Sequence, residues 1–232
     1  MITPKIIVAL DYPDAKSALK FANQVSPELC ALKIGKELFT STGPQLVEQL
    51  VRQNFKIFLD LKYYDIPNTV AKACRAAANL GVWMLNVHAM GGERMLVAAR
   101  ESIDSMAGEK PLLIAVTILT SFEASELLKV GITGSIQENV LRLAKLSLQT
   151  GLDGVVCSAR EIVIIRKTCG KHFSLVTPGI RPFNYQTQDD QRRIMTPEEA
   201  VAAGTDYLVI GRPVTQTVDP VQTLITINQT IN

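Results

Sequence analysis

Eight short apolar runs, rich in Ile, Val and Leu, recur along the whole of this 232-residue sequence and constrain its fold more than any other feature. The segments between the runs repeat apolar residues with the spacing of an amphipathic helix. Strands that alternate with helices predict parallel βαβ units, and eight units favour an α/β fold closed as a single (β/α)8 TIM barrel. The predicted strands span residues 6–10, 31–35, 56–61, 83–87, 112–118, 154–157, 174–176 and 207–210.

Capping residues predict where several of the helices begin and end. Asp14 can cap a helix that starts at the next residue. Thr196 and Glu199 form a capping box, and Gly204 suits the C-terminal end of the same helix. Since no linker or low-complexity segment interrupts the series, we expect one domain over residues 1–232.

The charge balance and the cysteines limit the classes of function. The 24 Lys and Arg residues nearly cancel the 22 Asp and Glu residues, which leaves no broad positive field for nucleic acid or an anionic membrane. Four scattered cysteines, without a Cys-x-x-Cys pair and with only two histidines, predict neither a disulfide framework nor a zinc site. The first apolar run is too short for a signal peptide or a membrane span, so we expect a cytoplasmic protein. The cysteines are Cys30, Cys74, Cys157 and Cys169.

Charged residues follow the apolar runs at the strand ends where barrel enzymes carry their chemistry. Alternation along the third strand places Phe58, Asp60 and Lys62 on the face that points into the barrel. The same alternation puts Asp11 and Lys33 at the ends of the first two strands. Buried charges are costly unless they are paired or used, so alternating Asp and Lys residues predict a functional array. Lys62 between carboxylates would remain an ammonium, which suits proton donation to a carbon atom.

Gly-Arg sequences after the last two strands predict a phosphate site. Gly211-Arg212 follows the eighth run, and Pro178-Gly179-Ile180-Arg181 follows the seventh. Glycine lets backbone N–H groups approach an oxyanion closely, and arginine offers a planar fork of donors. Barrels frequently bind phosphate in these two loops. The long polar connection 181–194 follows the seventh strand, and we expect it to serve the same site.

Several motifs, spread over the whole chain, resemble those of one enzyme family. They are Val8-Ala9-Leu10-Asp11, Leu32-Lys33-Ile34-Gly35, Asp60-Leu61-Lys62, Asp65-Ile66-Pro67-Asn68-Thr69-Val70, Thr120-Ser121, Thr177-Pro178-Gly179-Ile180-Arg181-Pro182, Asp190-Gln191-Arg192-Arg193 and Gly211-Arg212-Pro213. In this order they are similar to the motifs of the orotidine 5′-phosphate decarboxylase family. One departure is Tyr64, because the family often has histidine at that place.

The resemblance implies an enzyme of pyrimidine nucleotide synthesis that converts orotidine 5′-phosphate to UMP without a metal or an organic cofactor. It implies that Lys62 protonates C6 of the pyrimidine, with Asp60 beside the substrate carboxylate. It also implies a homodimer in which Asp65 and Thr69 reach into the neighbouring subunit's site. The catalytic set implied by the resemblance is Lys33, Asp60, Lys62 and Asp65. The implied substrate contacts are Asp11 and Lys33 to the ribose, Thr120 and Ser121 to the base, and Arg181, Gln191, Gly211 and Arg212 to the phosphate, with Pro178 as a further contact.

Two alternatives remain at this point. Related barrels, such as 3-keto-L-gulonate 6-phosphate decarboxylase and hexulose-phosphate synthase, share an Asp-x-Lys-x-x-Asp motif but use Mg²⁺ and carry an acidic residue near the end of the second strand. Lys33 occupies that place here, and its positive charge opposes metal binding. A non-catalytic phosphosugar-binding barrel is the other alternative, and it would need the phosphate groups but not the array of Asp and Lys residues.

Overall fold

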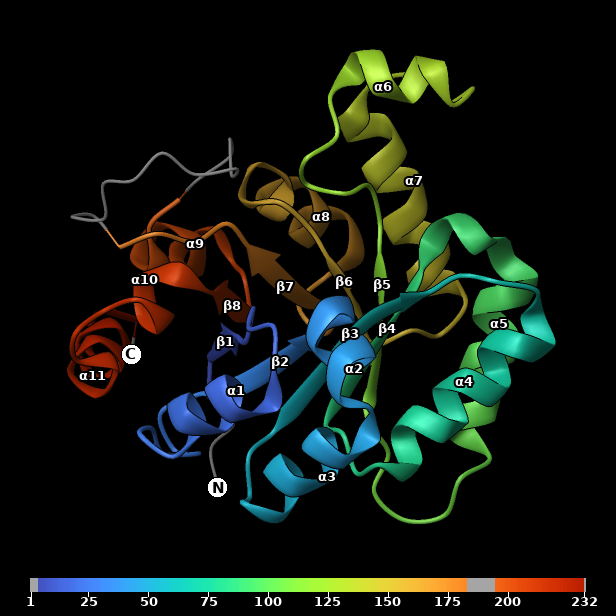
Figure 1. Cartoon of the computed structure of the whole chain (residues 1–232). Coiled ribbons are helices and arrows are strands. Elements are labelled where there is room, and N and C mark those ends of the chain that lie inside the picture. The colour runs from blue at the N-terminus through green and yellow to red at the C-terminus, as the bar shows by residue number, and fades with distance from the viewer. Residues whose placement is uncertain (1–3, 183–194, 232) are drawn as a thin grey trace.

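The described strands of this chain form a closed barrel. The computed structural model describes residues 4–182 and 195–231. Within them, eight parallel strands pair in the order of the sequence, and the last strand pairs with the first. Helices surround this barrel (Figure 1), so the predicted (β/α)8 fold is confirmed. The strands are β1 (Ile6–Ala9), β2 (Ala31–Gly35), β3 (Ile57–Tyr63), β4 (Met84–His88), β5 (Leu112–Val116), β6 (Gly154–Val156), β7 (Ser174–Pro178) and β8 (Tyr207–Ile210).

Two helices begin at the capping residues that the sequence predicts. The side chain of Asp14 accepts a hydrogen bond from the N–H of Ser17 at 2.8 Å and caps α1. Thr196 and Glu199 form the capping box of α9, which ends at Gly204 in the left-handed conformation. The helices are α1 (Ala15–Ala22), α2 (Lys36–Thr42), α3 (Pro44–Arg52), α4 (Pro67–Asn79), α5 (Gly92–Asp104), α6 (Ala124–Lys129), α7 (Ile136–Gln149), α8 (Ile162–Cys169), α9 (Pro197–Ala203), α10 (Arg212–Thr215) and α11 (Pro220–Ile231), with the 3-10 turns η1 (Ala89–Gly91) and η2 (Ala159–Glu161).

Alternation along the strands divides the core into two layers. In β1, Ile7 and Ala9 belong to the cluster inside the barrel, whereas Ile6 and Val8 pack outward against the helices. In β3, Phe58 belongs to the inner cluster and is almost fully buried. Residues that follow at every second position therefore also point inward, and those at the C-terminal ends of the strands reach the mouth of the barrel.

Aromatic side chains occupy the other end of the barrel, at the N-terminal ends of β4 and β8. The ring of Trp83 meets the ring of Tyr207 edge to face, with 5.1 Å between the ring centroids. The ammonium of Lys56 lies 5.5 Å from the centre of the Trp83 ring. Both rings pack against the inner cluster, so this end of the barrel is filled with side chains.

Two strand ends differ from the sequence prediction in a way that shapes the mouth of the barrel. The prediction ends the third strand at residue 61, but β3 continues through Lys62 to Tyr63. It ends the fifth strand at residue 118, but β5 stops at Val116. Ile118 and Thr120 therefore lie on the loop after β5, where apolar residues extend the wall of the barrel beyond the last ladder hydrogen bond.

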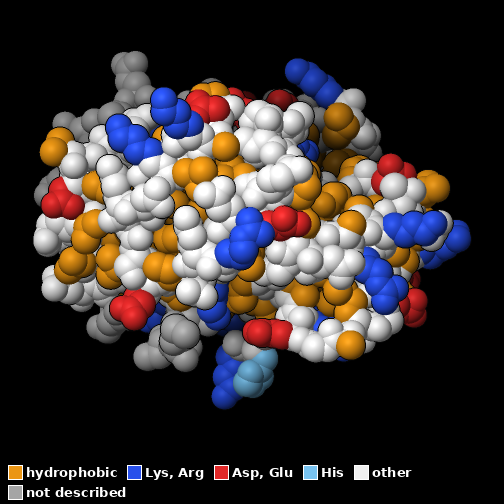
Figure 2. Space-filling model, turned by 60° about the horizontal axis from the view of Figure 1, so that its bottom comes forward, with side chains coloured by type: hydrophobic (Ala, Val, Ile, Leu, Met, Phe, Trp, Pro, Cys, Tyr) orange, Lys and Arg blue, Asp and Glu red, His pale blue; other side chains and the backbone are white. Residues whose placement is uncertain are grey.

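The surface charges of the described residues are mixed in sign, and the cysteines are unpaired. On the face drawn in Figure 2, the described Lys and Arg side chains are interspersed with Asp and Glu side chains, as the near balance of charges leads one to expect. None of the described helices has the length and apolar character needed to cross a bilayer. All four cysteines are free thiols, and burial raises the pKa of Cys30, Cys74 and Cys157 to about 12.

Candidate active site

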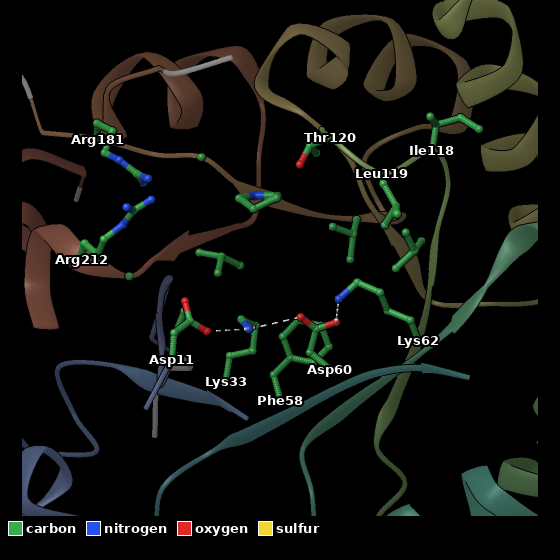
Figure 3. A pocket seen from close by; sticks show the side chains of 17 residues that line it. Asp11, Lys33, Phe58, Asp60, Lys62, Ile118, Leu119, Thr120, Arg181 and Arg212 are labelled. Atoms are coloured by element: carbon green, nitrogen blue, oxygen red, sulfur yellow. Dashed lines mark hydrogen bonds and ion pairs between the residues drawn. The ribbon is translucent and has the colours of Figure 1, made fainter. Parts of the chain in front are cut away.

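A cavity of about 280 Å³ opens at the C-terminal ends of the strands. Figure 3 shows it from close by. Charged residues line the side formed by β1, β2 and β3, and apolar residues line much of the opposite side. The lining residues are Ala9, Asp11, Lys33, Phe58, Asp60, Lys62, Val116, Ile118, Leu119, Thr120, Val156, Pro178, Gly179, Arg181, Val209, Gly211 and Arg212.

Four side chains of alternating charge form a continuous series along the charged wall (Figure 3). Asp11 Oδ1 lies 3.7 Å from Lys33 Nζ, and Lys33 Nζ lies 3.3 Å from Asp60 Oδ2. The other oxygen of that carboxylate, Asp60 Oδ1, accepts a hydrogen bond from Lys62 Nζ at 2.7 Å. The predicted convergence of Asp11, Lys33, Asp60 and Lys62 is therefore present within one chain.

Asp60 is the centre of this series and its most buried acid. Its exposed fraction is 8%, and burial alone would raise the pKa of its carboxyl group. The positive charges of Lys33 and Lys62, together with hydrogen bonds from Lys62 and Asn86, outweigh burial and hold the pKa of Asp60 below its usual value. Asp60 is therefore an anion at neutral pH, and both of its oxygens face ammonium groups. Among the described residues, this site included, no three His, Cys, Asp or Glu side chains converge where they could hold a metal ion.

The backbone around Lys62 departs from regular strand geometry. Lys62 has φ +52°, in the left-handed region, and the pairing of β3 with β4 shifts register between Leu59 and Tyr63. The N–H of Lys62 donates to the side-chain oxygen of Asn86 at 2.8 Å instead of to the ladder. This arrangement turns the ammonium of Lys62 toward Asp60 and the cavity, where 27% of the Lys62 side chain remains accessible.

Two arginines lie on the far side of the cavity from Lys62. In Figure 3 the guanidinium groups of Arg181 and Arg212 lie side by side and point into the cavity from the same side. Gly179 has φ +80°, which suits glycine, and Gly211 immediately precedes Arg212. The chain ends of the connection 181–194 meet here, because Ile180 and Met195 form a parallel bridge and Arg181 N–H donates to the Met195 carbonyl at 3.0 Å. Two adjacent cations beside glycine backbone suit an anion with several oxygens.

Three of the predicted residues that the structure describes, Asp65, Thr69 and Ser121, do not line this cavity. Asp65 lies just after β3, and its carboxylate accepts from the N–H of Ile66 at 2.6 Å. Asp65 is exposed before α4, Thr69 is exposed in its first turn, and Ser121 is exposed on the loop after β5. Gln191 lies outside the described residues. The charged series inside one chain is therefore Asp11, Lys33, Asp60 and Lys62, without Asp65.

The sequence prediction did not include Asn86 or the apolar wall formed by Val116, Leu119 and Val156. Val116 and Val156 could have been found from the same alternation that predicts Asp60, because they end β5 and β6 on the inward face, whereas Leu119 lies on the loop after β5. Asn86 is two positions after the inward-facing Met84 in β4. It was overlooked because a neutral amide inside an apolar run carries no charge signal.

His88 follows Asn86 at the end of β4 and packs beside the charged wall. Its ring stacks on Tyr64 with 5.7 Å between centroids, and its Nδ1 accepts from the N–H of Met90. Burial, followed by the positive charges of Lys36 and Lys62, lowers the pKa of His88. His88 therefore adds no positive charge near neutral pH and supports the turn after β4.

A closed barrel with a charged cavity at the C-terminal ends of its strands is the arrangement of a (β/α)8-barrel enzyme. The chain belongs to the orotidine 5′-phosphate decarboxylase / HUMPS family, whose family model matches residues 4–227. It is 59% identical to an orotidine 5′-phosphate decarboxylase of Hydrogenovibrio crunogenus, over 98% of this chain and 96% of that protein. It is 56% identical to one of Vibrio vulnificus, over 100% of this chain and 99% of that protein. A crystal structure of orotidine 5′-phosphate decarboxylase from Lactobacillus acidophilus matches with a TM-score of 0.89 at 36% identity and covers both chains fully.

Proposed function

We propose that this chain decarboxylates orotidine 5′-phosphate to UMP, with neither a metal nor an organic cofactor. The observation that carries the proposal is the alternating series Asp11, Lys33, Asp60 and Lys62, which faces two arginines across one cavity. The names of the relatives agree with this activity. A nucleotide that spans the cavity would place its phosphate at one end and its base at the other.

The chemistry of the reaction requires a positive charge at Lys62. Loss of CO2 from C6 leaves a carbanion in an sp² orbital, which the π system of the ring cannot delocalise. Stabilisation must therefore be electrostatic, and a preorganised ammonium can supply it and then transfer its proton to C6. Asp60 holds Lys62 Nζ at 2.7 Å and fixes it in place before the substrate arrives. The carboxylate of the substrate would lie beside the carboxylate of Asp60, and the two negative charges would repel each other. Departure of the substrate carboxylate as CO2 would remove this repulsion.

Remote parts of the substrate would be bound by other lining residues, together with Ser121 and Gln191. Arg181 and Arg212, with the backbone of Gly211 and with Gln191, would hold the phosphate, and Pro178 would lie against the substrate nearby. Asp11 and Lys33 would bind the ribose hydroxyls, and Thr120 and Ser121 would contact the base. Binding energy from the phosphate can then support positioning at C6 in the transition state.

We further propose that the active form is a homodimer in which Asp65 and Thr69 complete the neighbouring site. Both residues are exposed here, and two large apolar side chains flank Asp65. Tyr64 is 62% exposed and Ile66 is 67% exposed, and a protein interface would cover them. The single described barrel leaves Asp65 outside its own cavity, which supports a role in a second copy.

A metal-dependent sugar-phosphate lyase, such as hexulose-phosphate synthase, is the second candidate, because the family description names HUMPS beside orotidine 5′-phosphate decarboxylase. The contacts of Asp60 favour the first candidate, since Lys33 and Lys62 already occupy both of its oxygens. A divalent cation at that carboxylate would have to displace an ammonium.

We also propose that the reaction takes place in the cytoplasm, because a reducing compartment suits the four free thiols of this chain.

Release of CO2 from orotidine 5′-phosphate in the presence of EDTA tests the proposal directly. We expect turnover to persist in EDTA and UMP to accumulate. If activity is lost in EDTA and restored by Mg²⁺, the metal-dependent candidate replaces it. Binding of UMP without any release of CO2 would identify a binding barrel instead.

The dimer is tested by mixing two inactive variants, Lys62→Ala and Asp65→Ala. A mixed dimer contains one site with both residues intact, so random exchange should restore about one quarter of wild-type activity. If the mixture stays inactive while each variant binds UMP, Asp65 does not act across an interface. As a control, Lys62→Ala mixed with itself should stay inactive.

A further inference from the structure

Lys62 adopts a backbone conformation that residues other than glycine rarely take. Its φ of +52° lies in the left-handed region, where the Cβ atom crowds the backbone. Such a conformation persists only when neighbouring groups fix it, and such positions gather at functional sites. The register shift between β3 and β4 frees the N–H of Lys62 from the ladder, so its partner must be found elsewhere.

That partner is Asn86, in the middle of β4. Asn86 Oδ1 accepts from the backbone N–H of Lys62 at 2.8 Å, and Asn86 Nδ2 donates to Asp60 Oδ1 at 2.7 Å. Its exposed fraction is 0%, and it is absent from the residues that line the cavity. Asn86 therefore lies behind the reacting groups and touches two of them at once.

The chemistry of the two contacts requires a primary amide of this length. A carboxylate can only accept and a backbone N–H can only donate, so the two contacts fix which end of the amide faces which group. An apolar side chain would leave a buried carboxylate oxygen and a buried N–H with one partner fewer. An aspartate would still accept from Lys62 N–H, but it would set a second carboxylate against Asp60.

We propose that Asn86 is a positioning residue, which joins the carboxylate of Asp60 to the backbone of Lys62 so that the Lys62 ammonium is held in one place for C6. This inference rests on the proposed decarboxylation, and it adds a residue that neither the charge pattern nor the cavity lining includes. Asn86 does not touch the substrate. It acts through the two residues that do.

The groups around Asp60 determine how loss of Asn86 would be detected. Lys33 faces Asp60 from β2, Lys62 faces it from β3, and Asn86 faces it from β4. Asp11, on the loop after β1, reaches it only through Lys33. The hydrogen bond from Asn86 is one of the contributions that lower the pKa of Asp60. Its removal should therefore raise the pKa of Asp60 while the charges of both lysines remain.

Asn86→Ala is the first test, and it combines kinetics with binding. We expect kcat to fall about 10- to 100-fold, as is common when a group that orients a reacting residue is removed. The Kd for UMP should change much less than kcat, and the acid limb of the kcat/KM profile should move to higher pH. Wild-type kcat, or an unmoved acid limb, would overturn the proposal. So would a loss of UMP affinity as large as the loss of kcat/KM.

Asn86→Asp is the second test, and it retains the shape of the side chain. At neutral pH the introduced carboxylate cannot donate to Asp60, so kcat should be low. As the pH falls, the introduced carboxyl gains a proton and can donate to Asp60, so kcat relative to wild type should rise. A ratio that stays constant or falls toward acid pH would count against the proposal, and this variant can be measured even if Asn86→Ala does not fold.

A matched control comes from a second buried asparagine. Asn139 is 2% exposed, and its amide donates to the backbone carbonyls of Thr133 and Ser135 at the start of α7, outside the cavity lining. Asn139→Ala should reduce stability but leave the acid limb and the ratio of kcat to KM unchanged. An acid limb that moved equally in both variants would contradict the proposal, because it would report general loosening.

The carboxyl ¹³C shift of Asp60, followed by NMR in the protein without substrate, separates this inference from the proposed function. A higher titration midpoint in Asn86→Ala supports the Asn86 contact whether or not wild-type protein releases CO2. An unchanged midpoint overturns the role of Asn86, even if wild-type protein is a decarboxylase.

Discussion

The two ends of this barrel differ in the side chains that occupy them. At the N-terminal ends of the strands, Trp83 and Tyr207 fill the interior edge to face, and Lys56 covers the Trp83 ring. At the C-terminal ends, Asp60 and Lys62 leave a cavity in place of a packed core. The same alternation of inward-facing residues thus yields packing at one end and a site at the other.

The difference shows that the mouth of the barrel contains features that lower the stability of the fold. Buried charges such as Asp60 lower stability unless partners compensate, and Lys62 takes a left-handed conformation that costs about 1–2 kcal/mol for a residue with a Cβ atom. At the aromatic end, the residue other than glycine with a positive φ is Asn54, before β3, and asparagine tolerates that conformation better than lysine does. We therefore expect substitutions at the mouth to change catalysis, and substitutions at the aromatic end to change stability.

The largest effect is expected for Lys62→Ala, which removes the ammonium at C6. Turnover of orotidine 5′-phosphate should fall about 10⁴-fold or more, at the upper end for loss of a general acid. Binding of UMP, measured by calorimetry, should persist because the phosphate contacts are distant from Lys62. Lys171→Ala, an exposed lysine on the loop before β7, serves as the control and should keep full activity. Substantial turnover by Lys62→Ala would remove the proposed distinction between the two ends.

Arg212→Ala should give the next largest effect, and the effect should appear in KM. Loss of a charge-assisted contact to phosphate costs about 1.5–3 kcal/mol, or roughly a 10- to 150-fold rise in KM. The same variant should be indistinguishable from wild type with orotidine, which lacks the phosphate. An equal loss for both substrates would assign Arg212 to the structure of the mouth instead of to phosphate binding.

Trp83→Leu probes the aromatic end and should change stability alone. It removes an aromatic pair and a cation–π contact, so the free energy of unfolding should fall by about 1–2 kcal/mol. The kcat and KM of the folded variant should equal those of wild type. Urea unfolding and steady-state kinetics on the same preparation measure both. A loss of kcat without a loss of stability would show that the two ends are coupled.

The smallest effect is confined to acid pH and concerns Asp60. Because its folded pKa lies below its usual value of 3.8, Asp60 contributes stability that is fully present above that value. This contribution should be lost as the pH falls below 3.8 through the folded pKa. The free energy of unfolding of wild type minus that of Asp60→Asn should therefore be constant near neutral pH and decline in acid. The corresponding difference for Trp83→Leu should not follow this curve.

Periodicity alone predicted much of the fold and the charged wall. The eight apolar runs gave the barrel, because strands that alternate with helices can close in few ways. Alternation placed Asp11, Lys33 and Asp60 at the mouth, since a strand leaves only two directions for a side chain. The extension of β3 past residue 61 was missed because it depends on pairing with β4.

Lys62 and Asn86 have features that the periodicity of the sequence could not predict. The sequence predicted that Lys62 points inward as part of a regular strand, but its backbone is left-handed and held by a side chain 24 positions away. Asn86 lies between Leu85 and Val87 and has no charge to distinguish it from the core. A contact between distant residues becomes visible only when the strands are paired.

A crystal structure of the protein with bound UMP tests the central claim most directly. The account predicts that the phosphate lies between Arg181 and Arg212, and that C6 of the base lies about 3–3.5 Å from Lys62 Nζ, the separation of a near-attack arrangement. If C6 instead points away from Lys62, or Lys62 Nζ leaves Asp60 for solvent, the account is contradicted.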